Sequence, residues 1–198
     1  MKKQGILGRI GEVAILWVVM LGLTVLPVKL ALASTQRPLY PQELSQVAPQ
    51  GFGDRQNSAP WSMKWWRGKL YVGTVRAWYC WSQAWFEENF PIIEYPPSLP
   101  DVECTPDPLD LPLQAEIWCY TPETGNWELL YQAPKDVEIP GHPGYFTSRD
   151  IGYRTMAIFR ESDGRDALYV GGATANLLWP PMPPPRILRT TDGITFEP

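Results

Sequence analysis

The sequence predicts an all-β protein in which a four-stranded antiparallel unit occurs twice. Proline and glycine supply 22 and 16 of its 198 residues, a composition that favours short strands and loops over long helices. The tetrapeptide Leu-Tyr-Val-Gly occurs at 70–73 and again at 168–171, which indicates an internal repeat. With 44% hydrophobic residues the chain can bury a core, so disorder of the whole chain is excluded.

The N-terminus is predicted to be a signal helix. Lys2 and Lys3 precede an apolar run over 13–26, and residues 31–33 (Ala-Leu-Ala) fit a cleavage site. The run has 14 residues, whereas a spanning helix needs about 20, so an uncleaved membrane anchor is the less favoured alternative. We therefore expect a signal peptide over 1–33, a linker over 34–51, and export to the periplasm, the cell surface or the medium.

Eight strands are predicted, in the same order in both copies. The first copy has strands at 61–66, 69–74, 116–120 and 126–131, and the second at 154–159, 167–172, 186–189 and 194–197. Turns rich in Thr, Pro, Asp and Gly connect the paired strands, for example at 121–125 and 190–193. Each unit is therefore predicted to be a run of four consecutive antiparallel strands.

Several strands carry apolar groups on both faces, as with Met63, Trp65 and Trp66, so each sheet is expected to be sandwiched between neighbours. The motifs Trp-Ser-Met, Leu-Tyr-Val-Gly-Thr, Glu-Ile-Trp and Thr-Gly-Asn-Trp-Glu resemble the repeat of bacterial β-propellers of the kelch and Asp-box kind, over residues 52–198. The resemblance implies two propeller blades, at about 52–135 and 150–198, with a Pro-rich insertion at about 76–114. Residues 191–196 resemble a shortened Asp-box, which is a structural turn in such families.

Two blades make an incomplete propeller, because propellers usually have about four to eight blades. Two explanations are open. The chain is a fragment of a longer propeller, which is the favoured interpretation, or copies of it assemble to cover their open edges.

The three cysteines are interpreted in the light of export to an oxidising compartment. Cys119 lies in a strand-like run beside Ala115 and Ile117, so we expect it to be a buried free thiol. Cys80 and Cys104 lie on either side of a Pro-rich stretch and are the preferred disulfide pair. Three reduced thiols are the alternative.

Long connections are predicted to gather at one end of the strands, at 75–114, 133–152 and 173–185, and such loops are where binding usually resides. Trp78, Trp81 and Trp85 have helical spacing, so a short helix could lie there as a stacking platform for sugar rings or an apolar partner; the alternative is that they form the core of the loop. The candidate ligand-binding residues are Arg76, Trp78, Trp81, Trp85, His142, Asp150 and Arg154. Arg76 and Arg154 could clamp a carboxylate or pair with nearby acids.

Composition and motifs favour a non-enzyme. The formal charge of −4 opposes nucleic-acid binding, and we expect no membrane contact beyond the signal peptide. A single His, and the absence of zinc spacings and of a Gly-x-Ser-x-Gly motif, argue for no metal and no cofactor. The leading interpretation is an exported, non-catalytic binding or scaffold module whose partner is carbohydrate or another extracytoplasmic protein. The alternative is a sialidase-like or other glycan-cleaving propeller enzyme with further blades.

Overall fold

Antiparallel β-strands dominate the structure, as the sequence predicts. The computed structural model describes residues 38–90, 92–99 and 102–198. The predicted signal peptide, 1–33, lies outside the described residues. No helix in the described part of the chain is long and apolar enough to cross a membrane.

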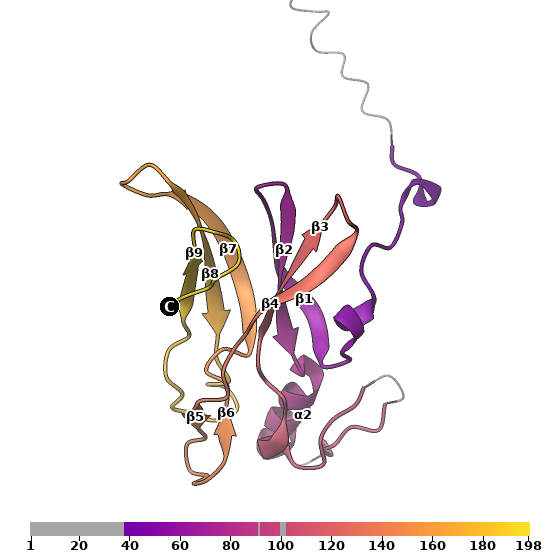
Figure 1. Ribbon diagram of the computed structural model, residues 1–198. Coiled ribbons are helices and arrows are strands. Elements are labelled where there is room, and N and C mark those ends of the chain that lie inside the picture. Colours follow the sequence, from indigo (N-terminus) through magenta and orange to yellow (C-terminus); the bar gives the residue numbers. More distant parts are fainter. Residues whose placement is uncertain (1–37, 91, 100–101) are drawn as a thin grey trace, which may run out of the picture. The chain divides into compact units, whose positions relative to one another are not determined.

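The chain divides into two units, residues 1–45 and residues 46–198. The described part of the first unit holds one short 3-10 helix, η1 (Pro41–Glu43). The second unit begins with another, η2 (Gln50–Gly53), and contains the strands that the structure describes (Figure 1).

Two runs of antiparallel strands, which we name the first and second meander, form the main sheet. The first contains β1 (Asn57–Trp66), β2 (Lys69–Arg76), β3 (Glu116–Thr121) and β4 (Asn126–Gln132), and the second contains β7 (Gly152–Arg160), β8 (Asp166–Ala173) and β9 (Ile187–Thr190). Within each meander every strand pairs with the next. Seven of the predicted strands are confirmed, with shifted ends. The eighth, at 194–197, is reduced to a bridge between Arg189 and Glu197.

The two meanders share one register. Matching pairs are Ser62–Gly73 and Thr155–Gly171, Met63–Val72 and Met156–Val170, Trp65–Leu70 and Ile158–Leu168, and Gly73–Ile117 and Gly171–Ile187. Even the β-bulge recurs, because the unpaired extra residue is Trp61 in β1 and Arg154 in β7. The Leu-Tyr-Val-Gly repeat therefore lies on the second strand of each meander.

The expectation of two separate four-stranded sheets is wrong, because the meanders join into one curled seven-stranded sheet with the order β4-β3-β2-β7-β8-β9 and β1 beside β2. Val75 pairs with Gly152, and the backbone N–H of Arg76 donates to the carbonyl of Ile151 at 2.9 Å. The physical reason is that the pairing of β3 with β2 ends at Gly73, which leaves the end of β2 with backbone groups that need partners. β7 supplies them.

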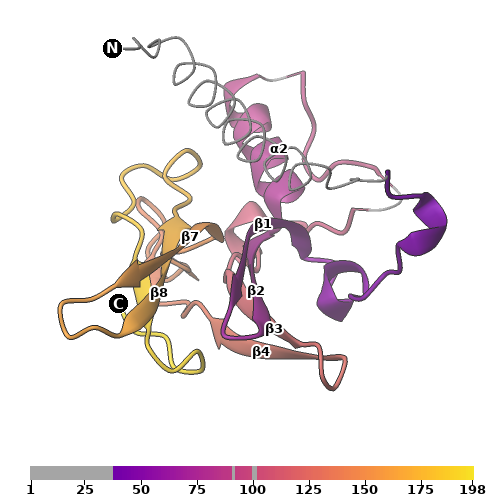
Figure 2. The ribbon, with the colours of Figure 1, turned by 90° about the horizontal axis from the view of Figure 1, so that it is seen from above.

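The strands of the two meanders face each other in the view from above (Figure 2), and a core of apolar side chains lies between them. The first meander contributes Trp66, Tyr71, Ile117 and Cys119, and the second contributes Tyr153, Leu168, Val170 and Leu188. The Tyr71 hydroxyl donates to the carbonyl of Gly193 at 3.2 Å, which links β2 to the last turn of the second meander. The two meanders therefore form one packed body.

The expected burial of both strand faces is found for β2 but not for β1. Tyr71 and Val72, which point to opposite faces, are both buried, whereas Met63 and Trp65 are 61% and 56% exposed. On that side Phe52 stacks on Trp118, with ring centroids 4.8 Å apart. On this face Phe52 of the N-terminal segment thus covers β3 and β4, at Trp118 and Trp127.

Tight turns lie at one end of the strands and long connections at the other (Figure 1). The long connections hold α2 (Trp78–Asn89), η3 (Pro108–Asp110), and the small pair β5 (Val137–Glu138) and β6 (Phe146–Thr147). They share a core of their own that includes Trp81, Leu111, Ile139 and Trp179. The predicted gathering of the three connections is therefore present, and we name this part of the molecule the loop end.

Candidate functional site

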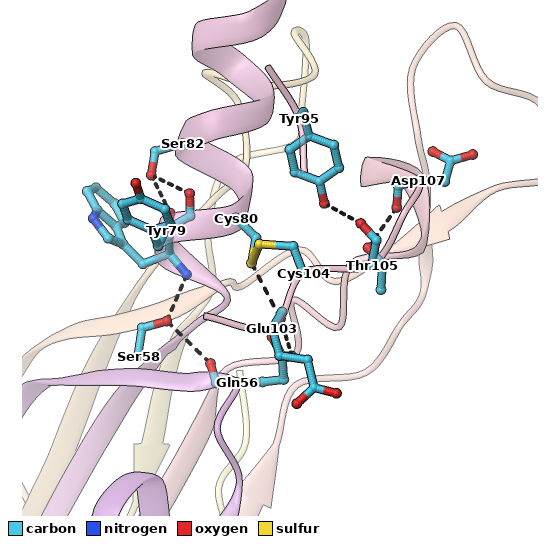
Figure 3. Close-up of a disulfide and its surroundings, with 11 residues drawn as sticks. Gln56, Ser58, Tyr79, Cys80, Ser82, Tyr95, Glu103, Cys104, Thr105 and Asp107 are labelled. Carbon is cyan, nitrogen blue, oxygen red and sulfur yellow. Dashed lines mark hydrogen bonds between the residues drawn. A yellow bond between two sulfur atoms is a disulfide. The ribbon is translucent and has the colours of Figure 1, made fainter. Parts of the chain in front are cut away.

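A disulfide between Cys80 and Cys104 fixes the start of α2 to the Pro-rich connection, and confirms the predicted pair (Figure 3). The Cα atoms are 5.5 Å apart. Next to it the Gln56 side-chain amide donates to the carbonyl of Glu103 at 2.8 Å, so the segment before β1 is held as well. Cys119 is free and buried, as expected, and burial raises the pKa of its thiol. The disulfide fits a protein of an oxidising compartment.

The helix predicted around Trp78, Trp81 and Trp85 is α2. Trp81 is buried and Trp85 packs against the same core, as in the alternative that these aromatics form the core of the loop. Trp78 differs, because it is 42% exposed. Its backbone N–H donates to the Ser58 hydroxyl at 2.9 Å, so the helix begins with a defined contact to β1.

Trp78 belongs to an aromatic cluster where the two meanders meet. Its ring meets Trp61 edge-on at 5.1 Å between centroids and Trp81 at 4.6 Å. The guanidinium of Arg154 lies 5.8 Å from the Trp61 ring centroid, which is a cation–π contact. The two bulge residues, Trp61 and Arg154, therefore touch each other next to the exposed Trp78.

Arg76 is enclosed by acidic partners. Its guanidinium lies 2.6 Å from Asp54 Oδ2 and 3.2 Å from Glu116 Oε1, and its Nε donates to the carbonyl of Pro112. Burial opposes the ionisation of Asp54, but hydrogen bonds from Gln56 and Arg76 outweigh it and lower the pKa of that carboxyl. Arg76 is itself buried and lies apart from solvent, whereas Arg154 is exposed. Arg76, on β2, therefore links Asp54 at the end of η2 to Glu116 on β3.

Asp150 is also an internal residue. It is fully buried, accepts the backbone N–H of Arg186 at 2.8 Å, and lies 3.3 Å from the Arg186 guanidinium. Burial raises the pKa of Asp150 although these donors oppose the shift. His142 lies in an exposed turn, where its backbone N–H donates to the carbonyl of Ile139. The structure therefore does not gather the seven candidates into one site; it brings Trp78, Trp81 and Arg154 close to Trp61.

A cavity of about 660 Å³ lies between residues 48–60 and the start of α2, in a region that sequence reasoning missed. Its lining combines polar and aromatic side chains with apolar ones: Phe52, Arg55, Gln56, Asn57, Ser58, Thr74, Tyr79 and Glu103 lie beside Ala48, Pro49, Ala59, Pro60, Ala77 and Val102. Asn57 is buried and donates to Glu116 Oε2 at 2.7 Å, while its Oδ1 has no hydrogen-bond partner. Residues 48–51 of the lining fall in the segment that the sequence predicts to be a linker, 34–51, so no site was expected there. No sequence pattern indicates that Asn57 contacts Glu116.

The chemistry at the loop end is that of hydrogen bonding and stacking. The buried carboxylates of Glu116 and Asp150 are both paired with arginines, Arg76 and Arg186. Across the described residues no group of three His, Cys, Asp or Glu side chains is arranged to hold a metal ion. The cavity wall instead offers side-chain amides, hydroxyls and the Tyr79 ring.

Comparison with known protein families, with curated proteins and with solved structures finds no match for this chain.

Proposed function

We propose that this chain is an exported, non-catalytic module that binds carbohydrate at its loop end, and that its two meanders are blades of the β-propeller type. The observation that carries the proposal is the cavity beside α2, which combines an aromatic ring with amide, hydroxyl and charged side chains. Sugars need both, because their C–H faces stack on aromatic rings while their hydroxyls need hydrogen-bond partners.

The rigidity of the cavity wall supports this proposal. Tyr79 precedes the disulfide residue Cys80 on α2, and Gln56 is held by the Glu103 carbonyl. A wall held in this way loses little conformational freedom when a ligand binds, which favours affinity. Trp78 precedes Tyr79 in the chain and is exposed but does not line the cavity; it stays a predicted ligand contact.

The shared register supports the propeller assignment. The same bulge and the same pairing occur twice, and the meanders pack face to face through apolar side chains. Radial stacking of equivalent sheets is the packing that defines a propeller. Loops that project from one end of such a stack are a usual place for ligands.

Binding to a glycan array, followed by titration of the best glycan, tests the function. Tyr79→Ala should weaken binding at least about tenfold, which corresponds to about 1.4 kcal/mol. Phe86→Ala is the matched control, because Phe86 is an aromatic residue of the same helix with similar exposure (40% against 36%) that does not line the cavity. Equal losses in both variants would contradict the proposal. Hydrolysis of a chromogenic sialoside by the unchanged protein would favour the glycan-cleaving alternative.

A further inference from the structure

Each meander buries one face in the shared core and leaves part of its other face exposed to solvent. On the first meander the open face, which we name the Met63 face, carries Met63, Trp65 and Leu129, which are 61%, 56% and 41% exposed. On the second meander the Phe159 face carries Phe159 and Ile187, which are 62% and 66% exposed. Strand pairing places the members of each set on one side of the sheet.

The two open faces are counterparts of the two faces that already pack together. Met63 corresponds in register to Met156, whose face of the second meander lies in the core. Tyr169, on the Phe159 face, corresponds to Tyr71, whose face of the first meander lies in the core. One Phe159 face and one Met63 face can therefore repeat the packing that holds the two meanders together.

The space over two equivalent glycines, Gly73 and Gly171, shows the same correspondence between a packed face and an open one. A Cβ atom on Gly73 would lie 2.7 Å from the Cβ of Tyr153, and the Ser62 hydroxyl beside it donates to the Tyr153 carbonyl at 2.7 Å. The equivalent Gly171 has only the Thr155 side chain within 4 Å. Thr155 is exposed and takes the place of Ser62 in the register. The slot over Gly171 is thus shaped like the one over Gly73 but has no neighbouring meander in it.

We propose that a second copy of this chain fills that slot, with its Met63 face packed on the Phe159 face. By register Pro60 corresponds to Tyr153, so the Thr155 hydroxyl donates to the carbonyl of the partner's Pro60. Such a contact is heterologous and leaves one open face at each end, and if it repeats the radial packing of propeller blades, the copies close into a ring. With two meanders a copy, a ring of about four to eight blades holds about two to four copies.

On the Met63 face, the proposed contact between copies is centred on β1. Phe52 already covers Trp118 and Trp127, and Val72 of β2 is buried, so the open part of the Met63 face lies mainly on β1, at Met63 and Trp65. On the other side the charges near Tyr169 are already balanced, since Arg189 is paired with Glu161. An apolar strip therefore meets a face on which Arg189 and Glu161 neutralise each other. The inference uses the sheet faces alone and is independent of the sugar site.

Light scattering on the full chain after size-exclusion chromatography gives the number of copies. Met63→Glu and Ile187→Glu each place a charge on one open face, and Leu177→Glu, 66% exposed at the loop end, is the matched control. The unchanged chain and Leu177→Glu should have the mass of a ring, whereas each face variant alone should have the mass of one chain. Circular dichroism verifies that all variants keep their strands.

Mixing the two face variants provides the decisive measurement. Met63→Glu keeps its Phe159 face and Ile187→Glu keeps its Met63 face, so an equimolar mixture should form one-to-one pairs that do not grow further. A single-chain mass for the unchanged protein would overturn the proposal. A mixture that fails to pair, or face variants that stay associated alone, would overturn it too.

Discussion

Arg76 shows how a residue with the chemistry of a ligand clamp can serve the fold. Its guanidinium lies between Asp54 and the buried Glu116, and replacing it with leucine leaves that carboxylate without its cation. Arg76→Leu should lower the free energy of unfolding by about 3–5 kcal/mol, as for other broken buried ion pairs. Urea denaturation measures this loss. Arg154→Leu, at an exposed arginine that loses only its cation–π contact with Trp61, should change it by no more than about 1 kcal/mol, and similar losses in both variants would contradict the assignment.

Glu161 makes the free energy of unfolding depend on pH in the acidic range. Hydrogen bonds from Arg189 and from the Tyr169 hydroxyl lower the pKa of Glu161 from its ordinary 4.5 to about 2. A carboxyl with a lower pKa in the folded state stabilises the fold above its unfolded pKa, and this contribution is lost as pH falls from about 4.5 through about 2. In Glu161→Gln the free energy of unfolding should therefore fall less between pH 6 and pH 2.5. Glu123→Gln, in an exposed turn, should retain the full decrease.

At the level of strands, the two equivalent glycines should respond differently to the same substitution in the Met63→Glu background, where the chain is expected to be single and no second copy fills the slot over Gly171. A Cβ on Gly73 meets Tyr153 of the neighbouring meander, including its backbone oxygen at 2.8 Å, whereas a Cβ on Gly171 meets only the exposed side chain of Thr155. Gly73→Ala should lower the free energy of unfolding by about 1–3 kcal/mol through overpacking. Gly171→Ala should lower it less, because Thr155 can rotate away. Equal effects in denaturant titrations of this single-chain variant would contradict the prediction.

The elements could be predicted where their information is local. The Leu-Tyr-Val-Gly repeat located β2 and β8, and the spacing of Trp78, Trp81 and Trp85 located α2. The contacts of single side chains were beyond reach, because Arg76 meets Glu116 forty residues along the chain. The cavity was missed for the same reason, since Asn57 is fixed by that same carboxylate. The position of Asn57 before the first predicted strand gives no indication that its side chain is buried.

As a whole, residues 46–198 should unfold in one step. The core between the meanders takes side chains from both, such as Ile117 and Val170, so neither can keep its apolar face buried alone. Tryptophan fluorescence reports mainly on the first meander and the loop end, while far-ultraviolet circular dichroism reports on all strands. Their urea transitions should coincide. Two separated transitions would show that the meanders are independent.

The joining of the meanders into one sheet could not have been predicted from the repeat, because it depends on how the repeat is interrupted. β3 pairs with β2 only as far as Gly73, and the end of β2 that remains is taken by Gly152. The sequence pattern specifies alternation within a strand but not which free edge a later strand will meet. The all-β class was therefore confirmed, while the separation of the two sheets was not.

The placement of every long connection at one end has a consequence for how the sequence can vary. The disulfide closes a loop between Cys80 and Cys104, so residues inserted near 92–99 would extend a segment whose ends are already clamped. The entropy lost in closing a loop rises only with the logarithm of its length, so such an insertion costs about 0.6 kcal/mol for each doubling. The strand register, set by tight turns at the opposite end, would not change. Foreign peptides grafted into this segment are therefore expected to leave the strands and their pairing unchanged.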